Sequence, residues 1–196
     1  MKEEEIISLI KDAIPQASKE VQLSIGDDGS VVEIDKNMQL VTVMDTIAVD
    51  THYPRNTDSQ SIGHKVFAVN LSDIAAMGAY ATYITVACSL KKKMFYKDFL
   101  ELINGIRDAC KELKINLIGG NLTSADINVI TVSAFGEIQK KNSNIKIMQR
   151  GNASIDDKIL LSGPIGGAAA GRKSVSYTHL RAHETDSYLV CRLLLE

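Results

Sequence analysis

The chain has 196 residues, 45% of them hydrophobic and 23% charged, and a formal net charge of −2. This composition is typical of a globular protein, and the length suffices for one full core and part of a second. The slightly negative charge argues against a nucleic-acid surface built from basic residues. No stretch approaches the roughly 18 consecutive apolar residues of a membrane span, and the acidic start MKEEEIISLIKDAI is unlike a signal peptide. We therefore expect a cytoplasmic protein that binds neither nucleic acid nor a membrane.

Apolar periodicity predicts an alternation of helices and strands. An amphipathic helix is expected from Glu3 to Ile14, followed by the strands VVEID and QLVTVMDTIAV, which the hairpin-like KN separates. The remaining expected elements are a helix from Ser61 to Met77, the strand ATYITVACSL, a helix from Phe95 to Leu113, a short strand INLIGG that ends at its two glycines, and the strand INVITVSAFGEI. This ββαβαβ-like order predicts an α+β domain over residues 1–138, a mixed sheet with helices on one face.

A second unit is expected after Ile138. The polar stretch QKKNSN reads as a surface connection, and residues 139–173 predict the start of an α/β domain, with a strand from Lys158 to Ser162. From Ser174 the composition changes abruptly and the segment resembles the translated read-through of a sequencing adapter. We therefore expect residues 174–196 to be a non-native tail and the second domain to be incomplete, the alternative being a genuine amphipathic helix.

The three cysteines show no CxxC spacing and lie in apolar or helical surroundings, which predicts buried, reduced thiols rather than a metal site or disulfides.

Acidic and amide side chains interrupt otherwise apolar elements. Asp73 stands in the small and apolar run AVNLSDIAAMGA, and no basic residue lies within seven positions of it. An isolated carboxylate in a packed helix costs several kcal/mol unless a partner neutralises it. Carboxylates that converge with no arginine nearby are more easily explained by cations, and Mg²⁺ prefers such oxygen ligands. The polar positions that could meet at one rim of the sheet are Asp27, Asp28, Asp45, Asn70, Asp73 and Asn121.

Each position also has a simpler interpretation. The GDDG motif is an ordinary turn sequence, and Asp45 could cap the segment after its strand. Asp73 could cap a helix that restarts after a break near Leu71. The paired glycines before Asn121 could form a tight bend, although glycines after a strand also let a backbone approach a phosphate.

Taken together, the motifs IGDDGSVV, MDTIAVDTHYP, GHKVFAVNLSDIAAMGA, LIGGN and QRGNASIDDKILLSGPIGGAAAG resemble the thiamine-monophosphate kinases. These enzymes belong to a superfamily with aminoimidazole ribonucleotide synthetase and selenophosphate synthetase. The resemblance extends from Ile6 to about Arg172. It implies ATP and Mg²⁺ at the edge of the N-terminal sheet, and a homodimer that forms through paired sheets.

The resemblance also implies roles for individual residues. Asp28, Asp45 and Asp73 occupy the positions of metal ligands, with Asp27 beside them. Asn121 stands where the family usually has an aspartate, and its amide oxygen can still coordinate Mg²⁺. The ATP-contacting positions are Gly120, Asn121 and Arg150, and His52 stands where the family contacts thiamine monophosphate. Considered alone, a histidine in DTHYP is more often a plain loop residue.

The implied reaction is ATP-dependent phosphorylation of thiamine monophosphate to thiamine diphosphate, with no general base, because the acceptor phosphate is already ionised. We expect the chain as written to be inactive alone. Two alternatives stay open: an ATP-dependent synthetase of the same superfamily, and a non-catalytic fragment that binds Mg-ATP.

Overall fold

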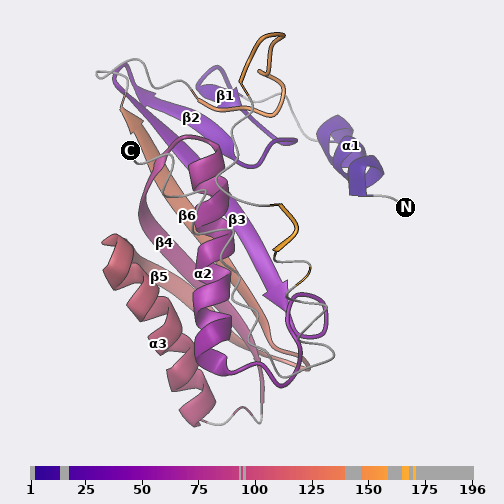
Figure 1. The fold of residues 1–196 in the computed structure, drawn as a ribbon, viewed down its shortest axis with the longest axis vertical. Coiled ribbons are helices and arrows are strands. Elements are labelled where there is room, and N and C mark those ends of the chain that lie inside the picture. The colour runs from indigo at the N-terminus through magenta and orange to yellow at the C-terminus, as the bar shows by residue number, and fades with distance from the viewer. Residues whose placement is uncertain are drawn as a thin grey trace.

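The computed structural model describes residues 3–13, 18–92, 94, 96–139, 147–158, 165–167 and 170. Within these residues the chain forms three helices and six strands in the order αβββαβαββ (Figure 1). Their bounds are α1 Glu3–Ala13, β1 Val21–Leu23, β2 Ser30–Asp35, β3 Met38–Ala48, α2 Ser59–Ala76, β4 Tyr80–Lys91, α3 Tyr96–Leu113, β5 Asn116–Ala125 and β6 Val129–Gln139.

The six strands form one mixed sheet with the order β1-β2-β3-β6-β4-β5. Every neighbouring pair is antiparallel except β4 and β5, which the crossover through α3 makes parallel. β6, the last strand in the chain, inserts between β3 and β4 and pairs with both along its length. The expected α+β class and mixed sheet are confirmed.

The core lies between the sheet and α2. Alternate residues of β3, β6 and β4 are buried beneath this helix, and α3 packs against α2 on the same side (Figure 1). The opposite face is more open: Thr46 and Thr131 hydrogen-bond across it at 2.8 Å, and Met44 is 70% exposed. Helices α2 and α3 therefore cover one face of the sheet, as the sequence predicted.

Two glycines allow α2 and α3 to approach closely. A Cβ placed on Gly63 would lie inside contact distance of the Leu102 carbonyl oxygen, and one on Gly105 would meet the Gln60 carbonyl in the same way. The obstacles are backbone atoms, which a rotamer change cannot move. Backbone packing at this crossing therefore requires residues without a side chain.

Strand β5 differs from expectation. It does not end at the paired glycines but continues through them to Ala125 as the edge strand next to β4. A Cβ on Gly120 would collide with the Val86 carbonyl of β4, and the pairing register shifts just before Gly119. Glycines inside a strand often mark such irregularities and close approaches. Neither a tight bend nor a loop is present at this point.

The apolar faces of helices α1 and α3 are only partly buried. The apolar residues of α1 remain accessible, with Leu9 58% exposed, and this helix lies apart from α2 and α3 (Figure 1). On α3, Leu102, Ile106 and Cys110 are buried, whereas Leu113 is exposed.

Several expectations concern residues that the structure does not describe or tests only in part. Cys88 and Cys110 are buried and free, as expected, and burial raises the pKa of both thiols. Most of the expected strand from Lys158 to Ser162, and all of residues 174–196 with Cys191, lie outside the described residues. The domain boundaries stay predictions. In the described part of the chain, no helix is both long and apolar enough to cross a membrane.

Candidate functional site

Asp27 and Asp28 lie in the turn between β1 and β2. The turn begins at Gly26, whose φ of +118° is rarely adopted by residues with a side chain, and the Asp28 amide donates to Asp27 Oδ1 at 2.9 Å. Both aspartates are partly buried. GDDG therefore forms a turn, and this turn presents two adjacent carboxylates close to the first residue of β2.

Asp45 lies inside β3, not at its end, and its position is tied to α2. The pairing of β2 with β3 stops at Thr42, and among the residues that the structure describes no strand pairs with the next part of β3 on that side. The Asp45 amide donates instead to Asn70 Oδ1 at 2.9 Å, while Asn70 Nδ2 donates to the Val66 carbonyl at 2.9 Å. Asn70 is fully buried at 0% exposure. The asparagine within an apolar helix thus positions the Asp45 backbone, a role that the sequence analysis did not assign.

Asp73 lies one turn further along α2. The helix is continuous from Ser59 to Ala76, so the idea of a helix restart near Leu71 is wrong. Burial, followed by the negative charges of Asp45 and Asp28, raises the pKa of Asp73 to about 6. The positive charge of Arg150 lowers the pKa of Asp73 and so offsets part of this increase. The carboxylates of Asp28 and Asp45 are therefore each close enough to Asp73 to repel its negative charge.

An arginine does lie beside these carboxylates, contrary to expectation. Arg150 Nε donates to Asp28 Oδ1 at 3.0 Å, its Nη2 forms an ion pair with the same oxygen, and its amide donates to Asp27 Oδ2 at 3.3 Å. The segment that carries it returns to the C-terminal end of α2, where the Met148 amide donates to the Met77 carbonyl at 3.2 Å. Arg150 is separated from Asp28 by 122 positions, so no local pattern could reveal the contact.

The donor chemistry of this carboxylate group, Asp27, Asp28, Asp45 and Asp73, suits a hard divalent cation. Among the residues described, no three or more His, Cys, Asp or Glu side chains are gathered tightly enough to hold a metal ion. Burial, and after it the charges of Asp45 and Asp28, nevertheless raise the pKa of Asp73, and a bound cation relieves such a buried, repelled carboxylate. In this structure part of the relief comes from the Arg150 guanidinium.

The remaining predicted site residues lie elsewhere. The His52 amide donates to the Ala48 carbonyl at 2.9 Å and His52 Nδ1 accepts from the Ala48 amide at 3.0 Å, so the ring belongs to the turn after β3. Gly120 and Asn121 lie on β5, three strands from β3. The strand register aligns Gly120 with Asp45 across the two strands between them. It aligns Asn121 with Thr46, whose side chain lies on the other face of the sheet. The described chain thus does not gather these three residues with the carboxylate group, and their roles stay predictions.

Comparison with known proteins identifies the family. Residues 26–138, which include the turn aspartates, Asp45 and Asp73, match the model described as AIR synthase related protein, N-terminal domain. The chain belongs to this family. The four aspartates of the carboxylate group thus lie within the region that matches the family, whereas Arg150 lies beyond it.

Its curated relatives are thiamine-monophosphate kinases. The protein of that name from Buchnera aphidicola subsp. Schizaphis graminum is 37% identical over 173 residues, which cover 85% of this chain and 50% of that protein. The Bacillus subtilis thiamine-monophosphate kinase is 33% identical, over 77% of this chain and 46% of that protein. This AIR synthase related chain is therefore homologous to thiamine-monophosphate kinases and spans about half of their length.

A solved structure, AaThiL complexed with AMPPCP and TMP, superposes with a TM-score of 0.78 at 25% sequence identity, covering 98% of this chain and 58% of that chain. The thiamine-monophosphate kinase of Stenotrophomonas maltophilia K279a superposes with a TM-score of 0.58 at 29% identity, covering 97% of this chain and 58% of the other. The resemblance seen in the sequence motifs is confirmed.

Proposed function

We propose that this chain is the ATP- and metal-binding part of a thiamine-monophosphate kinase, which transfers the terminal phosphoryl group of ATP to thiamine monophosphate. One observation supports the proposal most directly: the carboxylates of Asp28, Asp45 and Asp73 lie close to one end of α2, together with the Arg150 guanidinium. This combination suits phosphoryl transfer, which depends on positioning and on neutralising negative charge. The homology to thiamine-monophosphate kinases and the likeness to a structure complexed with AMPPCP and TMP support the same conclusion.

In the proposed reaction, the bond between the β,γ-bridging oxygen and the terminal phosphorus of ATP breaks, and a phosphate oxygen of thiamine monophosphate bonds to that phosphorus. ADP leaves and thiamine diphosphate forms. The acceptor is already ionised near neutral pH, so the chain needs no general base. The main barrier is therefore the repulsion between two anionic phosphates.

The carboxylate group would hold Mg²⁺ through Asp28, Asp45 and Asp73, with Asp27 as a further oxygen donor. Asn121, which the family resemblance places among the metal ligands, lies three strands from β3 on the other face of the sheet and would not reach the same ion. The metal would supply positive charge to the phosphate oxygens. Arg150 already lies beside these carboxylates, and its planar guanidinium matches a phosphate as well as it matches Asp28. We assign Arg150 to the ATP phosphates, together with the backbone of Gly120 and Asn121.

His52 is assigned to the acceptor. Because its Nδ1 accepts a hydrogen bond from the Ala48 amide, a neutral ring carries its proton on Nε2. That proton is available to an acceptor oxygen of thiamine monophosphate. The turn holds the ring in one orientation, which suits positioning rather than proton transfer.

A homodimer is part of the proposal. The sheet face opposite α2 presents partly exposed side chains, among them Met44 and Tyr83. Pairing two such faces would bury this surface, in keeping with the dimer that the family resemblance implies.

An ATP-dependent synthetase of the same superfamily is the second candidate, but the curated relatives favour the kinase. A third candidate is a chain that binds Mg-ATP without turnover. The matched relatives are about twice the length of the aligned region, so we expect the 196-residue chain to bind Mg-ATP and to lack kinase activity.

Binding of Mg-ATP is the first test. Isothermal titration calorimetry with Mg-ATP should give a binding isotherm for the unaltered chain and at least a tenfold weaker one for Asp45→Asn, because the loss of even an outer-shell partner of a metal ligand costs about 10–100-fold in metal affinity. Asp126→Asn is the matched control, since Asp126 is exposed and lies in the bend between β5 and β6. Equal affinity of all three proteins would contradict the assignment of the carboxylate group.

The reaction itself is tested with this chain and with any longer product of its gene. Thiamine diphosphate, measured by liquid chromatography, should form from thiamine monophosphate and ATP with the longer product and not in its absence. Product formation from an aminoimidazole precursor instead would favour the synthetase alternative.

A further inference from the structure

A cavity lies at the other end of α2 from the carboxylate group. Its volume is about 400 Å³, and Asp58, Ser59 and Ile62, at the start of the helix, form part of its wall. Asp73 lies fifteen positions after Asp58, which corresponds to about 22 Å along the helix. The cavity is therefore separate from the carboxylate group. None of its lining residues has a role in the proposed kinase reaction, although His52 precedes the lining residue Tyr53 in the same turn.

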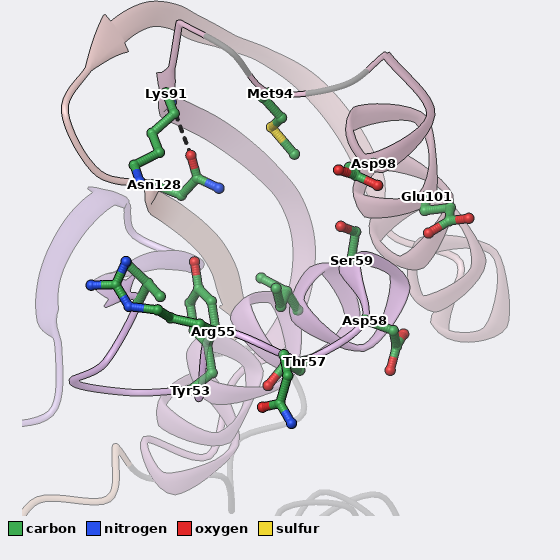
Figure 2. A pocket seen from close by; sticks show the side chains of 13 residues that line it. Tyr53, Arg55, Thr57, Asp58, Ser59, Lys91, Met94, Asp98, Glu101 and Asn128 are labelled. Atoms are coloured by element: carbon green, nitrogen blue, oxygen red, sulfur yellow. Dashed lines mark hydrogen bonds between the residues drawn. The ribbon is translucent and has the colours of Figure 1, made fainter.

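Tyr53 contributes a buried hydroxyl to this cavity. The residue is only 6% exposed, and its phenol oxygen has no hydrogen-bond partner within the described chain. Its backbone is fixed, because the Asp50 amide donates to the Tyr53 carbonyl at 2.8 Å. Figure 2 shows the phenol oxygen pointing toward the side of the cavity formed by Lys91 and Asn128. Burying a hydroxyl without a partner is unfavourable, so the site is poised for a ligand acceptor.

The hydroxyl acts as a donor at neutral pH. Burial, with a smaller contribution from the negative charge of Asp50, raises the pKa of Tyr53 above its ordinary value. The phenol therefore stays protonated and can donate to an oxygen. The ionised carboxylate or phosphate oxygens of small metabolites are the strong acceptors for such a donor.

Charges of opposite sign line the two sides of the cavity. Lys91 lies on the side of Tyr53, and Asp98 and Glu101 of α3 lie on the other side (Figure 2). Glu101 is paired with Lys97 at 3.6 Å. Within the described residues, neither the Lys91 ammonium nor the Asp98 carboxylate forms an ion pair, so both remain available.

The separation of positive and negative side chains on the two sides of the cavity limits which class of ligand it can bind. A phosphate or nucleotide would face the carboxylates of Asp58, Asp98 and Glu101, and a simple cation would leave the Tyr53 donor unsatisfied. We propose that the cavity binds a free amino acid, with the carboxylate at Tyr53 and Lys91 and the ammonium group at Asp98. The apolar side chains of Val49, Ile62 and Met94 also line the cavity and would contact the side chain of the ligand.

Saturation-transfer difference NMR of the 196-residue chain with a mixture of the proteinogenic L-amino acids at millimolar concentration tests this proposal. At least one amino acid should receive saturation from the unaltered chain. Tyr53→Phe, which removes only the hydroxyl, and Asp98→Asn should each weaken its binding about tenfold. Tyr80→Phe is the matched control, because Tyr80 is an exposed tyrosine at the start of β4.

Thermal unfolding distinguishes a ligand-binding role of the Tyr53 hydroxyl from a structural one. Without ligand, Tyr53→Phe should melt at the same or a higher temperature than the unaltered chain, because it removes an unpartnered buried hydroxyl. A lower melting temperature would mean that the hydroxyl has a structural partner and would overturn the proposal. No saturation transfer to any amino acid, or transfer that persists in both variants, would overturn it as well.

Discussion

Replacing Asn70 by alanine tests the connection between α2 and the carboxylate group. The side chain is fully buried and forms two hydrogen bonds, one from Nδ2 to the Val66 carbonyl and one from the Asp45 amide to Oδ1, both at 2.9 Å. Asn70→Ala removes both bonds and leaves the Asp45 amide without its acceptor. The variant should therefore lose stability and loosen the position of Asp45.

The expected magnitude follows from these contacts. Each hydrogen bond contributes about 1 kcal/mol net, and the space left by the buried amide costs about another 1 kcal/mol. Alanine offsets roughly 0.5 kcal/mol of this loss, because it favours the helix more than asparagine does. We expect a loss of about 2 to 3 kcal/mol in the free energy of unfolding.

Urea unfolding followed by circular dichroism at 222 nm measures the change as a shift of the midpoint at constant slope. Ser72→Ala on the same helix is the control, because Ser72 is only partly buried and has no role in the carboxylate group. This variant should stay within about 0.5 kcal/mol of the unaltered chain. An Asn70→Ala variant as stable as Ser72→Ala would refute the argument that Asn70 fixes β3 to α2.

Three further predictions follow from the same structure. In the absence of metal, the raised pKa of Asp73, about 6, means that the folded state binds more protons than the unfolded state between pH 4 and 6. Stability contributed by this group is therefore lost as the pH rises through that range. Asp73→Asn should match the unaltered chain below pH 4 and exceed it above pH 6 by about 1 kcal/mol after solvent screening, as measured by urea unfolding across pH. Gly63→Ala should destabilise the chain by about 1–3 kcal/mol despite its better helix propensity, because the added methyl meets the Leu102 carbonyl; a neutral effect in thermal unfolding would contradict the close crossing. Arg150→Ala should bind Mn²⁺ without nucleotide more tightly, by electron paramagnetic resonance titration, because it removes the cation that competes for Asp28; weaker binding would assign Arg150 a different role.

The local patterns of the sequence predicted most of the secondary structure. A period of two residues identified β3 and β6, and a period near 3.6 residues identified α3, because side chains that share a buried face recur at these intervals. The end of α2 just before Gly78 could also be predicted from the sequence, because Gly78 has a φ of +73°, which glycine adopts readily after a helix. These features depend on residues that are neighbours in the sequence.

The errors arose where a long-range contact decided the structure. The paired glycines in LIGG were interpreted as the end of a strand, but pairing with β4 carries the strand through them to Ala125. The chain near Asp73 contains no basic residue, yet Arg150 reaches the same site from a segment far along the sequence. Propensity cannot predict either result, because both depend on which distant segment is adjacent.

The sequence by itself determined the family and the acidic residues that the proposed reaction needs, because the motifs that carry both are short and contiguous. Only the tertiary structure decided how these residues relate to one another. It placed Asn70 as the acceptor for the Asp45 amide, brought Arg150 to Asp28, and left Asn121 on the far edge of the sheet. The physical reason is that burial, charge repulsion and hydrogen bonding act through space, between side chains that the fold alone brings together.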